Sequence, residues 1–127
     1  MTTNADPAPN APAPEAPDIS DAPDVSAELL DVFKALANPV RLQLLRWLRE
    51  PERHFPVEEA IADPAEVGVC VSHIQAKIGL AQSTVSAYMA ALERAGLVRS
   101  TRVGKWTHYK RDEDRIAWFV AALGRSL

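Results

Sequence analysis

The residues that point most directly to a chemistry are short polar and small side chains between positions 82 and 90. They are Gln82, Ser83, Ser86, Ala87 and Ala90, and no acidic residue follows them before Glu93. Short hydrogen-bonding side chains without negative charge can approach the base edges of the DNA major groove. The basic residues Arg102 and Lys105 lie further along the chain and suit contact with phosphate. Together these residues indicate a surface suited to duplex DNA.

Charge is unevenly distributed along the 127 residues, which carry a formal net charge of −3. Residues 1–24 contain five acidic residues, no basic residue and six prolines, a composition typical of a disordered tail. Residues 67–111 contain seven basic residues against Glu93 alone, a net charge of +6. A solvated surface would explain this run, but clustered cations also release condensed counterions when they meet a polyanion. We therefore expect a disordered acidic, Pro/Ala-rich tail at 1–24 and a folded domain at 25–127.

Length and motifs argue against several classes of protein. The length allows one domain, and no run approaches the roughly 18 apolar residues of a membrane helix. The first ten residues lack the basic residues and apolar run of a signal peptide, so we expect a cytoplasmic protein with no membrane partner. The single cysteine, Cys70, excludes an internal disulfide framework and a four-thiolate zinc site. No nucleophile elbow, phosphate loop or paired-histidine motif is present, so an enzyme is not expected.

End signals predict the helices of the first half of the chain. Ser26 is suited to cap a first helix, and Asn38 followed by proline is suited to begin a second. Residues 51–66, rich in proline and acids, are predicted to form an irregular connection. Ser72 and Gln75 match a capping box, which predicts a short third helix from residue 72 to 79.

The second half of the chain predicts the architecture. A fourth helix is expected over about 82–95, with Val85, Met89 and Leu92 on the face opposite the polar one. Residues 97–102 and 106–111 are rich in β-formers and flank Gly104, which predicts a two-stranded hairpin. A last helix follows from about residue 112. The expected fold is mainly α with a β-hairpin wing, a winged helix-turn-helix of four helices, two strands and one helix.

Three ordered segments resemble the ArsR/SmtB family of bacterial repressors. The strongest match runs from Gln82-Ser83-Thr84-Val85-Ser86 through Leu92-Glu93-Arg94-Ala95-Gly96-Leu97-Val98. The entry to the family's second helix is similar to Phe33-Lys34-Ala35-Leu36-Ala37-Asn38-Pro39-Val40-Arg41-Leu42, and its wing is similar to Gly104-Lys105-Trp106-Thr107-His108-Tyr109. The resemblance covers about residues 27–123.

The resemblance implies a homodimeric transcriptional regulator that binds an inverted repeat in double-stranded DNA, most simply a repressor released by an effector. The residues implied to face DNA are Gln82, Ser83, Thr84, Ser86, Tyr88, Arg102 and Lys105. The first and last helices would hold the dimer through Leu29, Phe33, Ile116, Phe119, Val120 and Leu123. The aromatic ring of Tyr88 could equally pack between the helices and the wing.

One residue departs from the family pattern at the start of the fourth helix. Ala81 stands where the family often has a serine, and serine would cap that helix. The loss of a cap typically costs about 1 kcal/mol. Ser83 could instead cap a slightly shorter helix, which would change the residues that reach the bases.

The effector is open among three classes. Many family members respond to metal ions through a Cys-Val-Cys motif, whose second cysteine is replaced here by Ser72. Cys70 and His73, completed by His54, could hold a metal or metalloid ion, although lone cysteines are commonly buried as small hydrophobes. Cys70 could also act as a thiol switch through an intersubunit disulfide or a thiol cap.

The third class is an organic effector, bound between the dimer helices and the 51–66 connection. Trp47, Phe55 and Trp118 could line such a pocket, although each is more often plain core or interface. A second functional class also stays open, because a winged helix can serve as a protein-interaction module. That use predicts an apolar or acidic recognition face on the fourth helix, whereas this face is short, polar and flanked by cations.

Deleting residues 1–24 tests the predicted division of the chain. We expect the promoter affinity of the truncated protein to lie within about threefold of that of the full chain. A tail without basic residues or buried surface adds no contact to DNA. Titration of both proteins against one labelled promoter fragment measures this. A larger change would show that the acidic tail competes with DNA or contributes to assembly.

Overall fold

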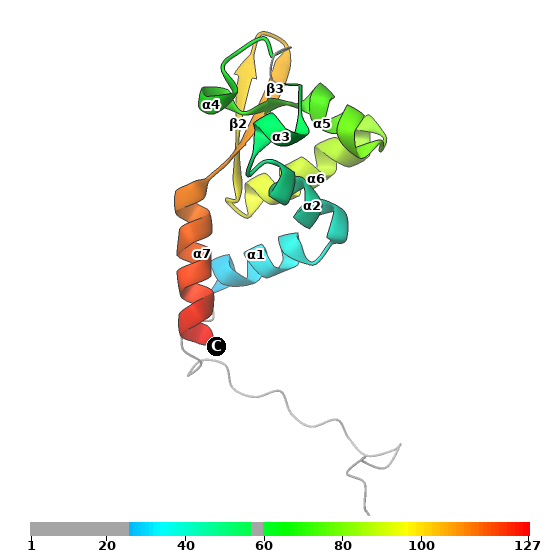
Figure 1. The fold of residues 1–127 in the computed structure, drawn as a ribbon. Coiled ribbons are helices and arrows are strands. Elements are labelled where there is room, and N and C mark those ends of the chain that lie inside the picture. The colour runs from blue at the N-terminus through cyan, green and yellow to red at the C-terminus, as the bar shows by residue number, and fades with distance from the viewer. Residues whose placement is uncertain (1–25, 57–59) are drawn as a thin grey trace, which may run out of the picture.

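The computed structural model describes residues 26–56 and 60–127, so the predicted tail at 1–24 lies outside the described residues. Ten elements follow one another along the described chain (Figure 1). They are α1 (Ala27–Leu36), α2 (Pro39–Trp47), α3 (Pro51–His54), α4 (Pro64–Val67), β1 (Val69–Cys70), α5 (Val71–Ile78), α6 (Gln82–Arg94), β2 (Val98–Val103), β3 (Trp106–Arg111) and α7 (Glu113–Ser126). None of the described helices is long and apolar enough to cross a membrane.

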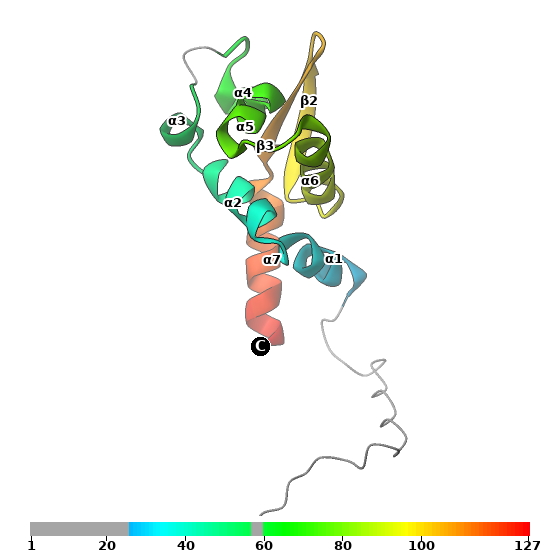
Figure 2. The ribbon, with the colours of Figure 1, turned by 90° about the vertical axis from the view of Figure 1, so that its right-hand side faces the viewer.

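The core is centred on the inner face of α6. Val85, Met89 and Leu92 are each 0% exposed, as the sequence predicted for that face. They pack with buried side chains of α1, α2 and α5, among them Val32 and Ile74. Burial of such side chains contributes about 1.5–3 kcal/mol each, so this contact fixes the rotation of α6 about its axis. Figures 1 and 2 show α6 beside β2, with α1 next to both α6 and α7 at the end of the molecule away from the β2–β3 turn.

The sheet has three strands rather than the two that the sequence predicted. Its order is β1-β3-β2, and β2 and β3 form the predicted hairpin with Val103 paired to Trp106. The added strand β1 is antiparallel to β3 and pairs Cys70 with His108. Gly68 makes this pairing possible, because it has φ +90° and a Cβ there would overlap the Tyr109 carbonyl oxygen. We call the β2–β3 hairpin the wing.

Most of the predicted helix ends are confirmed. Ser26 Oγ accepts a hydrogen bond from Leu29 N at 3.1 Å, and Asn38 Oδ1 accepts from the backbone N–H groups of α2. Gly79 has φ +76° and ends α5. Asp112 Oδ1 accepts from Arg115 N at 3.0 Å, and this hydrogen bond lowers the pKa of Asp112.

The capping box predicted at residues 72–75 is wrong. Helix α5 begins one residue earlier, at Val71, with Cys70 as its N-cap residue and no side-chain cap. Ser72 Oγ lies 3.2 Å from Cys70 Sγ, and Gln75 Nε2 donates to Leu80 O at 3.5 Å. Because Cys70 is held in β1 by its pairing with β3, the strand sets the point where the helix begins.

The irregular connection predicted at 51–66 is wrong at both ends. Pro51 and Pro64 each begin a four-residue helix, α3 and α4, at a position where a missing N–H has no cost. Asp63 Oδ1 caps α4 by accepting from Ala65 N at 3.0 Å. Residues 57–59, between these helices, lie outside the described part of the chain.

The expected missing cap of α6 is confirmed, and a substitution there tests it. Ala81 occupies the N-cap position without a side-chain hydrogen bond, while Ser83 lies inside the helix and does not cap it. Ala81→Ser should raise the free energy of unfolding by about 1 kcal/mol, because its hydroxyl can accept from a free backbone N–H.

Urea unfolding at one protein concentration measures this gain, since dimerisation makes stability concentration-dependent. Ala87→Ser is the matched control, because Ala87 is exposed within the same helix. It should lower stability by about 0.5 kcal/mol. Equal effects of the two substitutions would contradict the assigned start of α6.

Candidate nucleic-acid interface

The outward face of α6 presents the polar residues predicted to face DNA. Gln82, Ser83 and Ser86 are exposed, because the residues on the other side of the helix are fixed in the core. The first acidic residue of the helix, Glu93, lies near its end and accepts a hydrogen bond from Ser100 Oγ of β2 at 2.5 Å. The face therefore offers hydrogen-bonding groups to a partner without an acidic side chain among them.

Near its turn, the wing presents the two cations predicted to contact phosphate. Arg102 Nη1 donates to Thr107 Oγ1 across the hairpin at 3.2 Å, which uses only part of the donor set of its guanidinium. Lys105 lies in the turn after Gly104, with its Nζ 5.7 Å from the centre of the Trp106 ring. Both side chains are exposed, so both are available to phosphate.

The two remaining predicted DNA contacts are less exposed. Thr84 and Tyr88 are both half-buried. The guanidinium carbon of Arg41 lies 5.5 Å from the centre of the Tyr88 ring, and Arg41 Nε donates to Ala35 O at 2.6 Å. The Tyr88 ring thus packs against Arg41 of α2.

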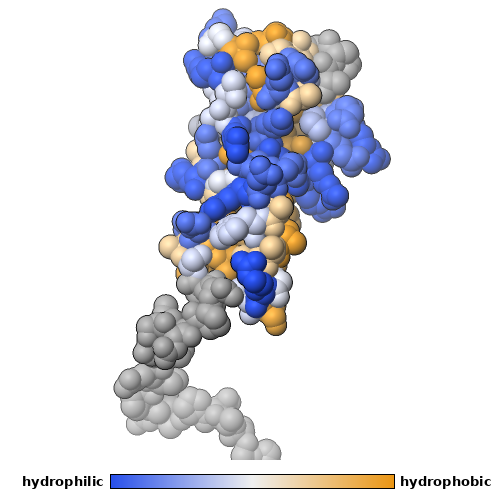
Figure 3. Space-filling view, turned by 90° about the vertical axis from the view of Figure 1, so that its left-hand side faces the viewer, coloured by the Kyte–Doolittle hydropathy of each residue, from blue (hydrophilic) through white to orange (hydrophobic). Residues whose placement is uncertain are grey.

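An exposed apolar surface covers α1 and α7. Leu30, Phe33 and Val120 are 42%, 41% and 60% exposed. Of the residues predicted for a dimer interface, Leu29 and Phe119 are buried in the core of the single chain, whereas Ile116 and Leu123 are half-buried. Figure 3 shows hydrophobic residues near this end of the molecule and mostly hydrophilic ones over its middle.

Comparison with known proteins identifies the family. The sequence profile described as "Bacterial regulatory protein, arsR family" matches residues 68–100. The uncharacterized HTH-type transcriptional regulator YbzH of Bacillus subtilis (strain 168) is 54% identical over 89 residues, which cover 70% of this chain and 88% of YbzH. The chain belongs to the ArsR family of bacterial regulatory proteins. The resemblance seen in the sequence is therefore confirmed, and the chain is a DNA-binding transcriptional regulator.

Other relatives of this ArsR-family regulator carry more specific descriptions. A putative arsenical resistance operon repressor of Halobacterium salinarum is 33% identical over 71% of this chain and 64% of its own length. A probable mercury resistance operon repressor of Streptomyces lividans is 34% identical over 77% of this chain and 63% of its own length.

A solved structure confirms the predicted winged helix-turn-helix fold. It is the homodimeric winged helix-turn-helix DNA-binding domain Mb0332 from Mycobacterium bovis, described as a possible ArsR-family transcriptional regulator. It superimposes with a TM-score of 0.54 at 29% identity, covering 78% of each chain. An ArsR-like regulator from Rhodococcus shares the fold with a TM-score of 0.57 at 24% identity, again over 78% of each chain.

The three residues predicted to hold a metal are not brought together in this ArsR-family chain. Cys70 and His73 line one pocket of about 160 Å³ beside Trp106 of the wing. His54 lines a different pocket and lies against Trp47, with ring centres 6.3 Å apart. Within residues 26–56 and 60–127, no group of three or more His, Cys, Asp or Glu side chains is placed to hold a metal ion. The described residues therefore do not form the predicted three-ligand site.

A buried histidine was missed by the sequence analysis. His108 is 1% exposed, and neither ring nitrogen has a hydrogen-bond partner among the described residues. It lies directly opposite Cys70 in the sheet, so the two side chains share one face. Only the register of β1 on β3 makes His108 a neighbour of Cys70, and this register cannot be read from the sequence around either residue.

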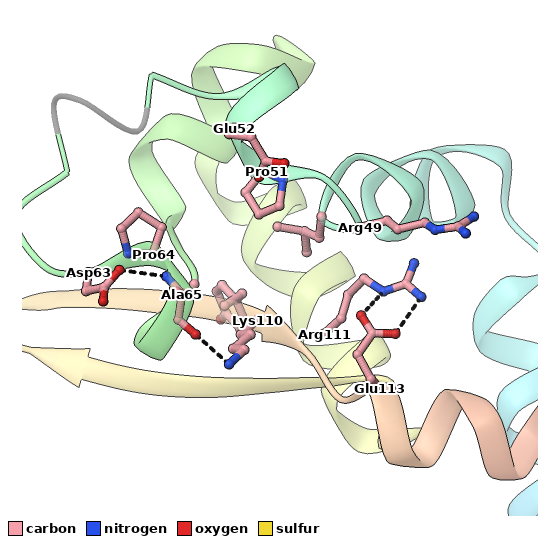
Figure 4. A pocket seen from close by; sticks show the side chains of 12 residues that line it. Arg49, Pro51, Glu52, Asp63, Pro64, Ala65, Lys110, Arg111 and Glu113 are labelled. Carbon is pink, nitrogen blue, oxygen red and sulfur yellow. Dashed lines mark hydrogen bonds and ion pairs between the residues drawn. The ribbon is translucent and has the colours of Figure 1, made fainter.

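A pocket of about 480 Å³ was located only in part by the sequence analysis (Figure 4). Its walls come from the ends of the 51–66 connection, as expected, and also from β3 and the first residue of α7. The aromatic residues predicted to line an effector pocket, Trp47, Phe55 and Trp118, do not line this one. Apolar residues such as Leu48, Pro64 and Ala65 line it instead, together with charged residues from the same segments.

Proposed function

We propose that this ArsR-family regulator is a homodimeric repressor whose helix α6 enters the major groove of an inverted-repeat operator. The observation that carries the proposal is the pair of faces of α6. One face is fully buried and holds the helix in place, while Gln82, Ser83 and Ser86 lie exposed on the other without an acid beside them. Such a helix can approach base edges without desolvating a negative charge.

The wing would supply contacts to the DNA backbone. Arg102 and Lys105 are exposed near the turn of the hairpin and would lie along the phosphates that flank the groove. Thr84, half-buried at the start of α6, would contribute at the edge of the same interface. Tyr88 would take part indirectly, because its packing on Arg41 holds α6 against α2.

The exposed apolar surface of α1 and α7 supports dimerisation. Leu30, Phe33 and Val120 would form its centre, because they remain exposed in the single chain and large apolar side chains gain most from burial. Ile116 and Leu123 would extend it along α7. The M. bovis neighbour is described as homodimeric, which agrees with this arrangement. Residues 25–127 would thus form the dimerising and DNA-binding unit, with residues 1–24 as an appended tail.

The Ser86→Glu substitution tests the assigned DNA-binding face. A glutamate at this exposed position would place negative charge against the groove, so promoter affinity should fall about a hundredfold or more. The substitution is on the surface, so thermal stability and dimer mass should stay as in the unchanged protein. Fluorescence anisotropy with a labelled promoter fragment measures the affinity.

Ser126→Glu is the matched control, because Ser126 is also exposed but lies at the end of α7. It should leave promoter affinity within about threefold. Unchanged affinity in Ser86→Glu would remove α6 from the interface and would favour a protein-interaction role for this winged helix.

A soft metal or metalloid ion is one candidate effector for this repressor. The relatives described as arsenical and mercury resistance repressors support it, and Cys70 and His73 share one pocket. The ligand count opposes it, because a stable site of this kind usually needs three or four protein ligands. Cys70 would be the thiolate ligand and His73 the imidazole ligand, without His54, which lines a different pocket.

Titration with Cd²⁺, followed by thiolate-to-metal charge-transfer absorbance, tests these two ligands. Cys70→Ser should abolish the band, because Cys70 is the only cysteine, and His73→Ala should weaken binding. His54→Ala is the control and should bind Cd²⁺ as the unchanged protein does. Equal binding by the His73→Ala protein and the control would remove His73 from the site.

A further inference from the structure

The 480 Å³ pocket has the size and composition of a small-molecule site (Figure 4). Sites for small organic molecules span roughly 300–1,000 Å³ and are lined mainly by apolar groups with a few polar ones. Leu48, Pro51, Pro64, Ala65 and the buried residue Tyr109 form the apolar part of the walls here. No residue of the proposed DNA-binding face contributes to it.

The walls are held in place by contacts between distant segments. Lys110 Nζ donates to Ala65 O at 2.6 Å, which joins β3 to α4. Arg111 joins β3 to two further elements, since it donates to Leu45 O at 3.3 Å and to Glu113 Oε2 at 2.9 Å. Because hydrogen bonds within the chain tie these walls to one another, a ligand would not have to order them, and preformed sites bind with a smaller entropic penalty.

The charge of the pocket points to an uncharged ligand. Three basic and three acidic residues line it: Arg49, Lys110, Arg111, Glu52, Asp63 and Glu113. Arg111 is paired with Glu113, and Asp63 accepts the hydrogen bond that caps α4. Burial raises the pKa of Tyr109, so its phenol stays neutral at physiological pH. A ligand with a net charge would lose hydration without meeting an opposite net charge.

We propose that this pocket binds an uncharged, largely apolar organic molecule, and that the bound molecule changes the affinity for DNA. The second part rests on the DNA-binding function proposed above. Tyr109, Lys110 and Arg111 are the last residues of the wing strand β3, and Glu113 is the first residue of α7. An occupant therefore contacts the strand that carries the wing and the start of a helix of the proposed dimer interface. If the occupant contacts these two elements differently in the DNA-bound and the DNA-free protein, each ligand changes the affinity for the other.

Two fluorescent probes that differ by one sulfonate group test the ligand class. N-phenyl-1-naphthylamine is neutral, and 8-anilinonaphthalene-1-sulfonate is its anionic analogue. The neutral probe should bind at one molecule per chain, and the anionic probe should bind about tenfold more weakly, because its sulfonate meets no net positive charge. Equal binding of the two probes would overturn the proposed ligand class.

Filling the pocket tests the location. Ala65→Trp should weaken binding of the neutral probe about tenfold or more, and Ala65→Leu should weaken it less. The tryptophan and leucine side chains would each occupy part of the cavity. Ala76→Trp, at an exposed position of α5 outside the pocket, should change binding by less than about twofold. Thermal melts confirm that each variant folds. Equal binding by all of these proteins would place the probe on another apolar surface and overturn the site.

The coupling is measured with promoter DNA and the same neutral probe. A saturating probe should weaken DNA binding about fivefold or more in the unchanged protein but not in Ala65→Trp. Probe binding in the pocket with unchanged DNA affinity would overturn the coupling. If neither the unchanged protein nor any variant bound promoter DNA in the absence of probe, the proposed DNA-binding function would be contradicted. Probe binding by the Ala65 variants would still decide where the probe binds.

Discussion

The contact on which the rest of the structure depends is the burial of one face of α6. Val85, Met89 and Leu92 are fully buried in the core, and truncation of such residues typically costs about 2–5 kcal/mol. Their burial fixes the rotation of α6, and this rotation points Gln82 and Ser86 toward solvent. The hydrogen-bonding face is therefore a consequence of the core, so core packing and DNA recognition are not independent properties here.

Strand β3 connects the parts that a regulator has to coordinate. One end carries the wing turn, its middle lies opposite Cys70, and its other end forms a wall of the 480 Å³ pocket. The chain then passes directly into α7 through Asp112, whose carboxylate caps that helix and pairs with Arg99 of β2 at 2.8 Å. A displacement at the pocket end of β3 can thus reach the turn of the wing through hydrogen-bonded neighbours rather than through a flexible linker.

The features that the sequence predicted correctly depend on neighbours a few residues apart. The caps at Ser26 and Asn38, the turn at Gly79 and the two faces of α6 all follow from local hydrogen bonding or helical periodicity. The errors involve contacts between distant segments. Strand β1, the true start of α5 and the neighbour of Cys70 are all set by pairing with β3, nearly forty positions along the chain. The burial of His108 and the β3 and α7 walls of the 480 Å³ pocket were missed for the same reason, since both depend on β1, β3 and the ends of the 51–66 connection coming together.

Chemical footprinting of the promoter tests the central claim most directly, because dimethyl sulfate methylates guanine N7 in the major groove. If α6 of each subunit of a symmetric dimer reads the DNA, the protein should protect guanines in two half-sites related by a dyad. Their centres should lie about 10 base pairs, or a multiple of one helical turn, apart. Protection of a single segment, or binding that leaves every major-groove guanine reactive, would contradict the account.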